Sequence, residues 1–363
     1  MKIVEFQNFD SLHEHLGAWE ALSAKTPMLS PLWIIQWWRT YQESMRGKLC
    51  FLAGFSGDQL VGFAPFYIEE AGRKRTLRFL GDGHVCSDHL TLQCDSRHED
   101  EFVKGVAAWL NQHVSEIWNG AYWECIPEND RKITALVELL GETHSVYRRP
   151  ACSSWYVELP ATWDEYLSRL SKNHRKRCRR WYREWIDSGK VTHEIVTEIG
   201  QLDQAFQDLC ELHNARRNFV HTPGAFEDPQ FFEFHKVVTR ELFAKNQLRL
   251  SFLRIDGKPM TCEYQFVDGD TAYSYQSGFD PQYRSVGAGN ISLMMAVKSA
   301  IDDGLSTFDF LRGNEKYKQS WKAEERKTVD IHIHQKTLTG SLEQAKLGTK
   351  DWLRSVRSLV TAQ

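Results

Sequence analysis

A glycine-rich loop in the C-terminal half of the chain has residue types that bind phosphate. The segment "DPQYRSVGAGN" contains the spacing Arg-x-x-Gly-x-Gly, and apolar patterns place it between a strand and a helix. Glycines let a ligand approach backbone N–H groups, and the positive N-terminal end of the following helix favours an anion. The loop therefore predicts a pyrophosphate site, although it also fits a glycine-rich turn capped by its asparagine. The predicted site residues are Arg284, Gly287, Ala288, Gly289 and Asn290.

A second cluster, "TFDFLRGNEKYKQSW", places charged and aromatic side chains directly after an apolar strand. Arg312, at the end of that strand, suits bidentate binding of a phosphate or carboxylate. On the short helix that follows, Tyr317 and Trp321 share one face, and Glu315 and Lys318 share another. Glu315 and Lys318 also fit a surface ion pair, and Trp321 fits the core. We expect functional roles for Arg312, Glu315 and Tyr317, because a buried strand end rarely needs such side chains.

The elements around these clusters occur twice along the chain. In the second half, a strand and two helices precede three strands with turns at Asp256-Gly257 and Asp268-Gly269, then a helix, a strand, a short helix and a strand. The first half has the same order, with a helix opened by Ser30-Pro31 and a hairpin turn at 56–58. The sequence therefore predicts an α/β (α+β mixed sheet) fold with two similar domains. Each domain would be a mixed, mostly antiparallel sheet flanked by helices.

The chain length of 363 residues also favours two domains. We predict an N-terminal domain over 1–155 and a C-terminal domain over 156–335 that includes a long basic linker helix, 162–188. The remaining residues, 336–363, are predicted to form an amphipathic helical tail that docks on the protein or lies on a membrane surface.

Composition narrows the class of protein. The net charge of −3 gives no global field that would attract nucleic acid or an anionic membrane. No segment reads as a signal peptide or a membrane span. The eight cysteines are scattered, which predicts free thiols, no metal site and a cytoplasmic location. Peripheral association with a membrane through the tail stays open.

Both clusters resemble motifs of a known enzyme superfamily. The Arg-x-x-Gly-x-Gly loop between strand and helix resembles the acyl-CoA pyrophosphate loop of GNAT acyltransferases. "FDFLRGNEKYKQSW" resembles the signature of the CelD-like or BioF2-like acetyltransferase branch, which is associated with polysaccharide biosynthesis and related to the tandem-domain Fem-type aminoacyl transferases. "WDEYLSRLSKNHRKRCRRWYRE" and "SPLWIIQWW" with "LVGFAPFY" resemble further parts of that branch. The resemblance covers most of the chain, and its most specific part is the signature.

The resemblance implies two tandem GNAT domains and an acyl-CoA co-substrate, most simply acetyl-CoA. In GNAT domains two parallel strands separate, and the pantetheine arm lies between them. Here those strands would be "TAYSYQSGF" and "TFDFLRG". Gln276 and Ser277 would contact the donor, together with Arg312 and the glycine loop, and exposed N–H groups would stabilise the oxyanion.

Direct transfer to an amine or hydroxyl also needs groups that move protons. Glu263 is a carboxylate in an otherwise apolar strand, so burial would raise its pKa and suit it to general base catalysis. The alternation of Glu263 with Cys262 and Tyr264 along the strand also allows the Glu263 side chain to face solvent instead. Tyr275 is a candidate acid, and Tyr317 is a third catalytic candidate.

The acceptor site is predicted from scattered side chains. Besides Glu315 and Lys318, the loop residue His221 is a candidate, although a lone loop histidine is more often incidental. The N-terminal half has no Arg-x-x-Gly-x-Gly before its helix near 98–113, so we predict that it has lost donor binding. It would instead help to shape an acceptor groove between the domains, through Trp37 and Asp88.

The basic run "KNHRKRCRRWYR" is compatible with several ligands, so it does not identify the second substrate. Its cations cover most of the circumference of a helix, which fits tRNA, a phosphorylated lipid carrier, the CoA 3′-phosphate or a solvated linker. The main hypothesis is transfer from acyl-CoA to an amine or hydroxyl, with a sugar or polysaccharide precursor as acceptor. The alternatives are a Fem-type transferase that uses aminoacyl-tRNA and a non-catalytic module of a polysaccharide-synthesis complex.

Overall fold

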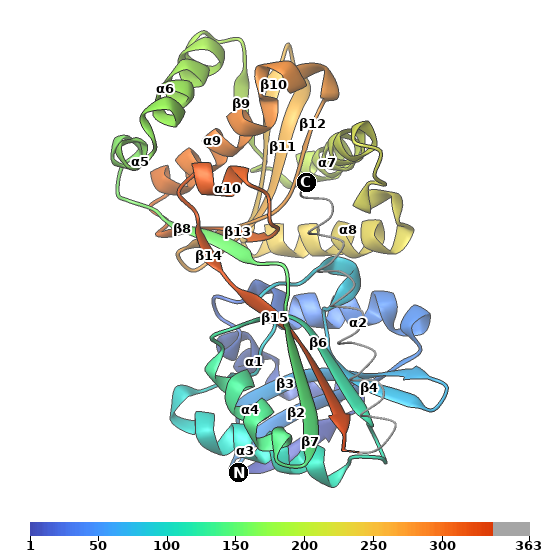
Figure 1. The fold of residues 1–363 in the computed structure, drawn as a ribbon. Helices are drawn as coiled ribbons and strands as arrows, with labels where there is room; N and C mark the ends of the chain where they lie inside the picture. The colour runs from blue at the N-terminus through green and yellow to red at the C-terminus, as the bar shows by residue number, and fades with distance from the viewer. Residues whose placement is uncertain (337–363) are drawn as a thin grey trace. The chain divides into compact units, whose positions relative to one another are not determined.

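The computed structural model describes residues 1–336 of the chain (Figure 1). The predicted tail helix, 336–363, lies outside these residues except for Lys336. Within the described part, no helix combines the length and the apolar character needed to cross a membrane. The eight cysteines all lie in this part and are free thiols.

The chain forms two compact units, and each combines segments that are distant in sequence. Unit 1 contains Met1–Ser23, Tyr41–Ala151 and the described residues from Lys327 onward, and unit 2 contains Ala24–Thr40 and Cys152–Arg326. This division differs from the predicted one, because residues 24–40 belong to unit 2 and β15 (Thr328–Gln335) belongs to unit 1. The reason is strand pairing: β15 lies between β6 (Gly120–Pro127) and β7 (His144–Pro150) in the sheet of unit 1.

Unit 1 is built on an eight-stranded sheet with the order β1-β2-β3-β4-β6-β15-β7, in which β5 also pairs with β3. All neighbours are antiparallel except β4 and β6. The other strands are β1 Lys2–Phe6, β2 Gly47–Ser56, β3 Gln59–Ala71, β4 Lys74–Phe79 and β5 Gln93–Cys94. The helices are α1 Leu16–Leu22, α2 Pro31–Met45, α3 Glu99–Gln112 and α4 Arg131–Gly141, of which α2 begins in unit 2.

Unit 2 is built on a seven-stranded sheet with the order β14-β8-β13-β12-β11-β10-β9. Its one parallel pair is β12 with β13. The strands are β8 Ser154–Glu158, β9 Thr192–Ile195, β10 Leu248–Ile255, β11 Lys258–Asp268, β12 Thr271–Phe279, β13 Thr307–Arg312 and β14 Glu324–Arg326. The helices are α5 Trp163–Arg169, α6 Lys172–Trp181, α7 Ile199–Phe219, α8 Pro229–Ala244, α9 Ala288–Asp302 and α10 Tyr317–Ser320.

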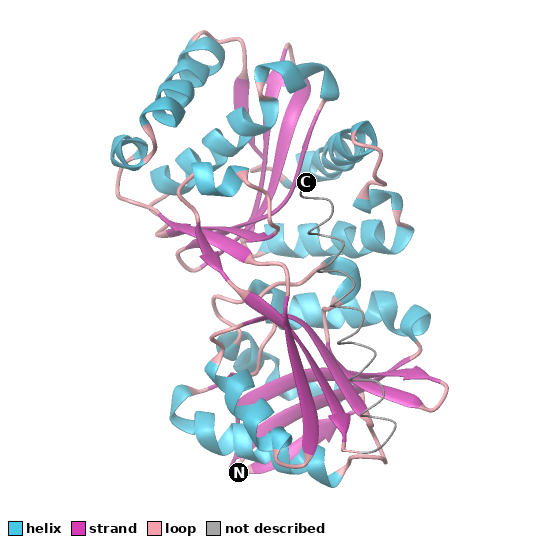
Figure 2. Cartoon of the chain, viewed as in Figure 1, coloured by secondary structure: helices cyan, strands magenta, loops and turns pink. Residues whose placement is uncertain are grey.

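The two units repeat one order of elements, which confirms the predicted fold class (Figure 2). In each, a strand and two helices precede three antiparallel strands, then a helix, and then a strand parallel to the third. The predicted caps and turns explain part of this order. The Ser30 hydroxyl accepts a hydrogen bond from Trp33 N–H at the start of α2, and Gly57 has a positive φ of 61° in the turn between β2 and β3.

Residues 24–40 are part of the core of unit 2. The Trp33 side chain is 1% exposed, and its ring centroid lies 5.0 Å from that of Phe234 and 5.3 Å from that of Phe266. The Tyr273 hydroxyl donates to the Lys25 carbonyl oxygen at 2.7 Å. Unit 2 therefore depends on a segment that precedes most of unit 1 in the sequence.

The predicted basic helix over 162–188 is two helices rather than one. Leu170 has an extended conformation with ψ 155° and ends α5, and the Ser171 hydroxyl accepts from His174 N–H to open α6. A serine cap of this kind satisfies an N–H group that would otherwise lack an acceptor, so it competes with continuation of the helix. After Trp181 the chain continues as a π-helical turn, Tyr182–Asp187.

Candidate functional site

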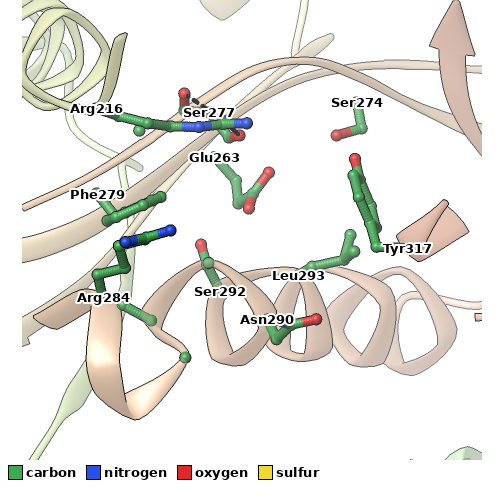
Figure 3. A pocket seen from close by; sticks show the side chains of 14 residues that line it. Arg216, Glu263, Ser274, Ser277, Phe279, Arg284, Asn290, Ser292, Leu293 and Tyr317 are labelled. Atoms are coloured by element: carbon green, nitrogen blue, oxygen red, sulfur yellow. Dashed lines mark hydrogen bonds between the residues drawn. The ribbon is translucent and has the colours of Figure 1, made fainter. Parts of the chain in front are cut away.

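A pocket of about 240 Å³ opens in unit 2 among β11, β12, α9 and α10 (Figure 3). It brings together eight of the residues that the sequence predicted: Glu263, Ser277, Arg284, Gly287, Ala288, Gly289, Asn290 and Tyr317. Six further residues line it: Arg216, Ser274, Gly278, Phe279, Ser292 and Leu293. In Figure 3, Arg284 and Phe279 lie at one end of the pocket, Tyr317 and Ser274 lie at the other, and Glu263 lies between them above α9.

The Arg284 end of the pocket is suited to an anion. Gly287 has a positive φ of 83° and forms the N-cap of α9, so the first-turn N–H groups of Ala288 and Gly289 lie beyond the reach of intrahelical carbonyl acceptors. The guanidinium carbon of Arg284 lies 5.1 Å from the ring centroid of Phe219, which orients this cation at the same end. A helix N-terminus beside an arginine is a natural site for a phosphate group.

Strands β12 and β13 separate beside the pocket. Their parallel pairing covers only Thr271–Tyr273 on β12 and residues 307–309 on β13. Further along β12 the register against β11 shifts: Tyr264 pairs with Gln276, but Gln265 pairs with Ser274. Tyr275 is therefore the extra residue of a β-bulge. The bulge interrupts the regular ladder at the place where the two strands diverge.

The bulge directs Tyr275 away from the pocket. The Tyr275 hydroxyl lies 3.1 Å from Nε2 of His235 on α8, and the residue is absent from the pocket lining. Ser274 and Ser277, on either side of the bulge, both line the pocket. The structure thus places the predicted acid Tyr275 next to a buried histidine and brings two serines toward Glu263.

Glu263 is buried in the pocket floor at 4% exposure. Burial raises the pKa of its carboxyl group to about 7, while a hydrogen bond from Ser292 and the charge of Arg216 act in the opposite direction. Arg216 is held in place by Ser277, whose hydroxyl accepts from Nη1 at 2.7 Å. A carboxyl group that titrates near neutral pH can accept a proton from a nucleophile.

Tyr317 stands across the pocket from the strands on α10. The residue is 43% exposed, and Figure 3 shows its hydroxyl pointing toward that of Ser274. Desolvation of the phenol, followed by the charges of Glu315 and Glu263, holds the pKa of Tyr317 above its usual value. The phenol is therefore protonated at neutral pH and can donate a proton.

Helix α7 reaches the pocket because Gly278 lets it approach β12. A Cβ atom at Gly278 would lie 2.4 Å from His213 N and 2.5 Å from Leu212 C. Nδ1 of His213 and Nη1 of Arg216 each lie 3.3 Å from the Ser277 carbonyl oxygen, and Nε2 of His213 accepts from Ala225 N–H. Burial lowers the pKa of His213 to about 4, so this imidazole is neutral and acts as a fixed hydrogen-bonding link.

We expect the Gly278→Ala substitution to lower stability by about 1–3 kcal/mol, because α7 must move away from β12 to admit a methyl group. The same movement would withdraw Arg216 from Glu263. Urea unfolding of the variant and the wild type measures the effect. Gly200→Ala is the matched control, since a Cβ atom there meets nothing within 4 Å. Equal stability of Gly278→Ala and wild type would show that the close approach of α7 is not required.

The residues of the second cluster mainly build a turn. Lys318 is 2% exposed, and its Nζ donates to the carbonyl oxygens of Leu311, Arg312 and Gly313 at 3.0–3.1 Å. The Lys318 Nζ also lies 3.1 Å from a carboxylate oxygen of Glu315. The side chain of Lys318 is therefore committed to this turn, and Arg312 ends β13 outside the pocket lining. Trp321 is 0% exposed, in the core of unit 2.

Four other predicted residues also lie outside the pocket lining. Gln276 is half-buried on β12, on the other side of the bulge from Ser274. His221 follows α7, is exposed and has a positive φ of 57°. Trp37 is fully buried in α2, and Asp88 is buried in unit 1.

Unit 1 differs from unit 2 at the position that corresponds to the anion end of the pocket. Its helix α3 begins with Glu99, Asp100 and Glu101, whereas the first turn of α9 contains no acidic residue. Phe102 occupies the space against the sheet, with ring atoms 2.5 Å from a Cβ built at Gly54 and 2.9 Å from one built at Gly62. Negative charge at a helix N-terminus repels phosphate, which supports the prediction that this half does not bind a donor.

Comparisons with known proteins agree with this geometry. Residues 172–319 match the family model described as an acetyltransferase (GNAT) domain. No curated protein matches the sequence. Within the described residues, no group of three or more His, Cys, Asp or Glu side chains is arranged to hold a metal ion.

Several solved structures share the fold at low sequence identity. FemX matches with a TM-score of 0.63 and 10% identity, covering 95% of this chain and 99% of FemX. A conserved protein of unknown function from Bacteroides thetaiotaomicron VPI-5482 has a TM-score of 0.56 and 10% identity, covering 92% of this chain and 100% of its own. L-PGS from Bacillus licheniformis has a TM-score of 0.55 and 10% identity, covering 94% of this chain and 96% of its own.

Proposed function

We propose, from the match of residues 172–319 to the acetyltransferase (GNAT) domain model, that the chain transfers an acyl group from acyl-CoA to an amine or hydroxyl. The observation that supports this proposal is that one pocket combines a site suited to an anion with a buried carboxyl group. Its Arg284 end offers a helix N-terminus to an anion, and its floor holds the buried carboxyl group of Glu263.

The donor is proposed to be acetyl-CoA or another acyl-CoA. Its pyrophosphate would bind the N–H groups of Ala288 and Gly289 and the guanidinium of Arg284. Its pantetheine arm would enter where β12 and β13 separate, so that the thioester lies near the β-bulge. Backbone N–H groups released by the bulge would stabilise the oxyanion that forms on the thioester carbonyl.

The proposed reaction is a direct attack on the thioester. The acceptor nitrogen or oxygen bonds to the acyl carbon, and Glu263 takes the proton that the nucleophile loses. The carbon–sulfur bond then breaks, and Tyr317 donates a proton to the thiolate of CoA. Bulk water returns the proton to Tyr317.

The acceptor is proposed to be a sugar or polysaccharide precursor, on the resemblance of the "FDFLRGNEKYKQSW" signature to the CelD-like and BioF2-like branch. The pocket supplies polar groups that suit a hydroxylated acceptor, namely Arg216, Ser274 and Ser277. We place the protein in the cytoplasm, where acyl-CoA is available.

Titration calorimetry with acetyl-CoA on the variant Gly289→Asp tests the donor site. Gly289 has no positive φ, and a Cβ atom there would lie 3.6 Å from Phe279, which is an ordinary contact. The substitution is therefore expected to keep the fold while placing a carboxylate where the pyrophosphate would bind. We expect affinity to fall by at least about tenfold, since one charge at a helix N-terminus contributes up to about 2 kcal/mol.

The matched control is Gly289→Ala, which adds only the methyl group and should bind acetyl-CoA nearly as tightly as the wild type. Wild-type protein that fails to bind acetyl-CoA and CoA at millimolar concentration would rule out the proposed donor. Equal binding by Gly289→Asp would place the donor elsewhere.

A second candidate is an aminoacyl-tRNA donor, as in Fem-type transferases, and the surface of α6 favours it. The structure leaves exposed the cations Lys172, Lys176, Arg177, Arg179 and Arg180 of α6, and Arg183 of the turn that follows. The buried residues of α6 are His174, Cys178 and Trp181. The exposed cations would bind phosphates, so tRNA retained by the purified protein would raise the absorbance at 260 nm and dissociate with salt. Purified protein without bound tRNA would favour acyl-CoA as the donor.

A further inference from the structure

Within residues 1–336, Arg216 is a half-buried cation of the pocket that forms no ion pair. It extends from α7, and its Nη1 donates to the Ser277 carbonyl oxygen at 3.3 Å and to the Ser277 hydroxyl at 2.7 Å. In the same part of the chain, neither Nε nor Nη2 of Arg216 has a protein partner, and neither is enclosed by the protein. One edge of the guanidinium is therefore open to a ligand in the pocket.

A charge withdrawn from water in this way is normally balanced by an opposite charge. Arg254 illustrates the usual arrangement in this protein, because its Nη2 lies 3.0 Å from a carboxylate oxygen of Asp208. Glu263 lines the same pocket as Arg216, but burial raises the pKa of Glu263 to about 7, so that carboxyl group is only partly ionised at neutral pH. Arg216 therefore retains positive charge that a bound anion would balance.

The Arg216 guanidinium lies beside the proposed base rather than at the Arg284 end of the pocket. Its central carbon is 5.9 Å from the ring centroid of Phe279, and Figure 3 shows this ring between Arg216 and Arg284. Figure 3 also shows the guanidinium close to Glu263, whose pKa responds to the charge of Arg216. An anion bound to Arg216 would thus lie next to the nucleophile that Glu263 deprotonates, so it would belong to the acceptor.

The open edge of the guanidinium favours a carboxylate. Nε and Nη2 form a planar fork that matches the two oxygens of a carboxylate. A phosphate would bring up to two negative charges beside Glu263, whereas a carboxylate brings one. Because the bonds to Ser277 already hold the side chain, little further ordering of Arg216 is needed when the ligand binds.

We propose that Arg216 binds a carboxylate of the acceptor, so that the acceptor is an acid whose amine or hydroxyl lies a few bonds from its carboxylate. The inference rests on the proposed function and names the substrate class of the same pocket. Acidic sugars and amino acids both have this chemistry. Arg216 sets the specificity by holding the carboxylate, and this places the nucleophile at Glu263.

Two pairs of amines that differ in a carboxylate test the proposal. The amino acid pair is β-alanine and β-alaninamide, and the sugar pair is 2-amino-2-deoxyglucuronic acid and glucosamine. Rates of acetyl transfer from acetyl-CoA are expressed per unprotonated amine. The wild type should favour the acid of a pair by at least about tenfold in kcat/KM, mainly through a lower KM, because a charged hydrogen-bonded pair contributes about 1.5–3 kcal/mol. The pair that shows the preference identifies the source of the carboxylate, and a preference in neither pair would overturn the proposal.

Arg216→Gln should remove the preference, with Arg217→Gln as its matched control. Glutamine keeps an N–H donor for Ser277, so the variant is expected to fold, which urea unfolding checks. Arg217 is the next residue on α7, is exposed and does not line the pocket, so Arg217→Gln should keep the preference. Arg216→Lys keeps the charge without the fork and should keep part of it. A change in Glu263 caused by these variants affects both members of a pair alike and cancels in the ratio.

Saturation-transfer NMR supplies a readout that needs no turnover. With CoA present, saturation of the protein should reach the acid of the preferred pair in wild type and in Arg217→Gln. It should be lost in Arg216→Gln and weak for the neutral member of the pair in all three proteins. Equal signals from the acid and the neutral amine in wild type would overturn the carboxylate site. An Arg216→Gln variant that is slowed equally with every acceptor would assign Arg216 to the transfer step itself and would overturn the site as well.

The outcomes separate this inference from the proposed function. Wild type that transfers acetyl groups without preference for either acid would leave the function standing and remove the carboxylate site. Wild type that binds no CoA would remove the proposed function. The NMR comparison on the free proteins would then decide the carboxylate site by the same criterion, since a signal that Arg216→Gln abolishes supports the site and equal signals overturn it.

Discussion

Glu263→Gln is expected to lower kcat for acyl transfer by about 10²–10⁴-fold, because it removes the group that accepts the proton of the nucleophile. Gln keeps the shape of the side chain and its hydrogen bond to Ser292. Binding of acetyl-CoA, which depends on the loop at Gly287–Asn290, should therefore stay close to that of wild type. Steady-state release of CoA and calorimetry on the two proteins measure these quantities. A variant that keeps full activity would exclude Glu263 as the base.

The pH dependence of the wild type should report the same group. Burial raises the pKa of Glu263 to about 7, so its base form is scarce in acid and predominates in alkali. We expect kcat/KM to rise with pH through neutrality and then to level off. In Glu263→Gln this rise should vanish. A rise that persists in the variant would assign the titration to another group.

Stability should change with pH in the opposite sense. The folded pKa of Glu263 lies above the ordinary value of 4.5, so the folded protein holds a proton that the unfolded chain has released between pH 4.5 and about 7. Stability therefore falls as pH rises through this window. Above it, the charged carboxylate costs at most roughly 3 kcal/mol. Glu263→Gln should thus be more stable than wild type at pH 8 and similar to it at pH 4.

Local patterns were enough to predict which residues line the Arg284 end of the pocket. The loop at 284–290 is continuous in sequence. Its glycines indicate a position that needs a positive φ, which Gly287 has, and they mark the start of the helix that follows. Glu263 stood out as a carboxylate in an otherwise apolar strand. The repeat of elements also followed from local periodicity, because each helix and strand buries one face or stripe.

Residues positioned by long-range contacts were missed. Arg216 lies on a 21-residue helix far from the loop in sequence, and it reaches Ser277 only because Gly278 lets α7 approach β12. Ser292 could have been found, since it lies two positions after Asn290 in the first turns of the helix. Residues 24–40 belong to unit 2 and β15 belongs to unit 1 because of strand order and packing between distant segments. Hydrophobic periodicity and composition do not carry this information.

Irregular backbone explains the other differences. Simple alternation along β12 does not reveal the extra residue Tyr275, whose bulge sends its side chain toward His235. Lys318 looked like half of a surface pair with Glu315. The chain turns back after Leu311, which has a positive φ of 55°, and this turn brings three carbonyl oxygens to the ammonium group.

Lys318→Met is therefore expected to destabilise unit 2 by about 3 kcal/mol, because it leaves buried carbonyl groups without their donor. Methionine keeps the apolar stem of the side chain, so the loss would come from the ammonium group. The turn also carries Tyr317, whose hydroxyl lies across the pocket from Ser274. Acyl transfer should decline together with stability. Urea unfolding and CoA release measure the two effects.

Lys316→Met is the matched control, since Lys316 lies two positions earlier in the same turn and is exposed. Exposed lysines contribute little, so this variant should remain within about 0.5 kcal/mol of wild type. If Lys318→Met unfolds at the same urea concentration as Lys316→Met, the three hydrogen bonds do not hold the turn. Lys318 would then be available for the acceptor role that the sequence first suggested. A stable Lys318→Met with impaired acceptor use would be the result that supports that role.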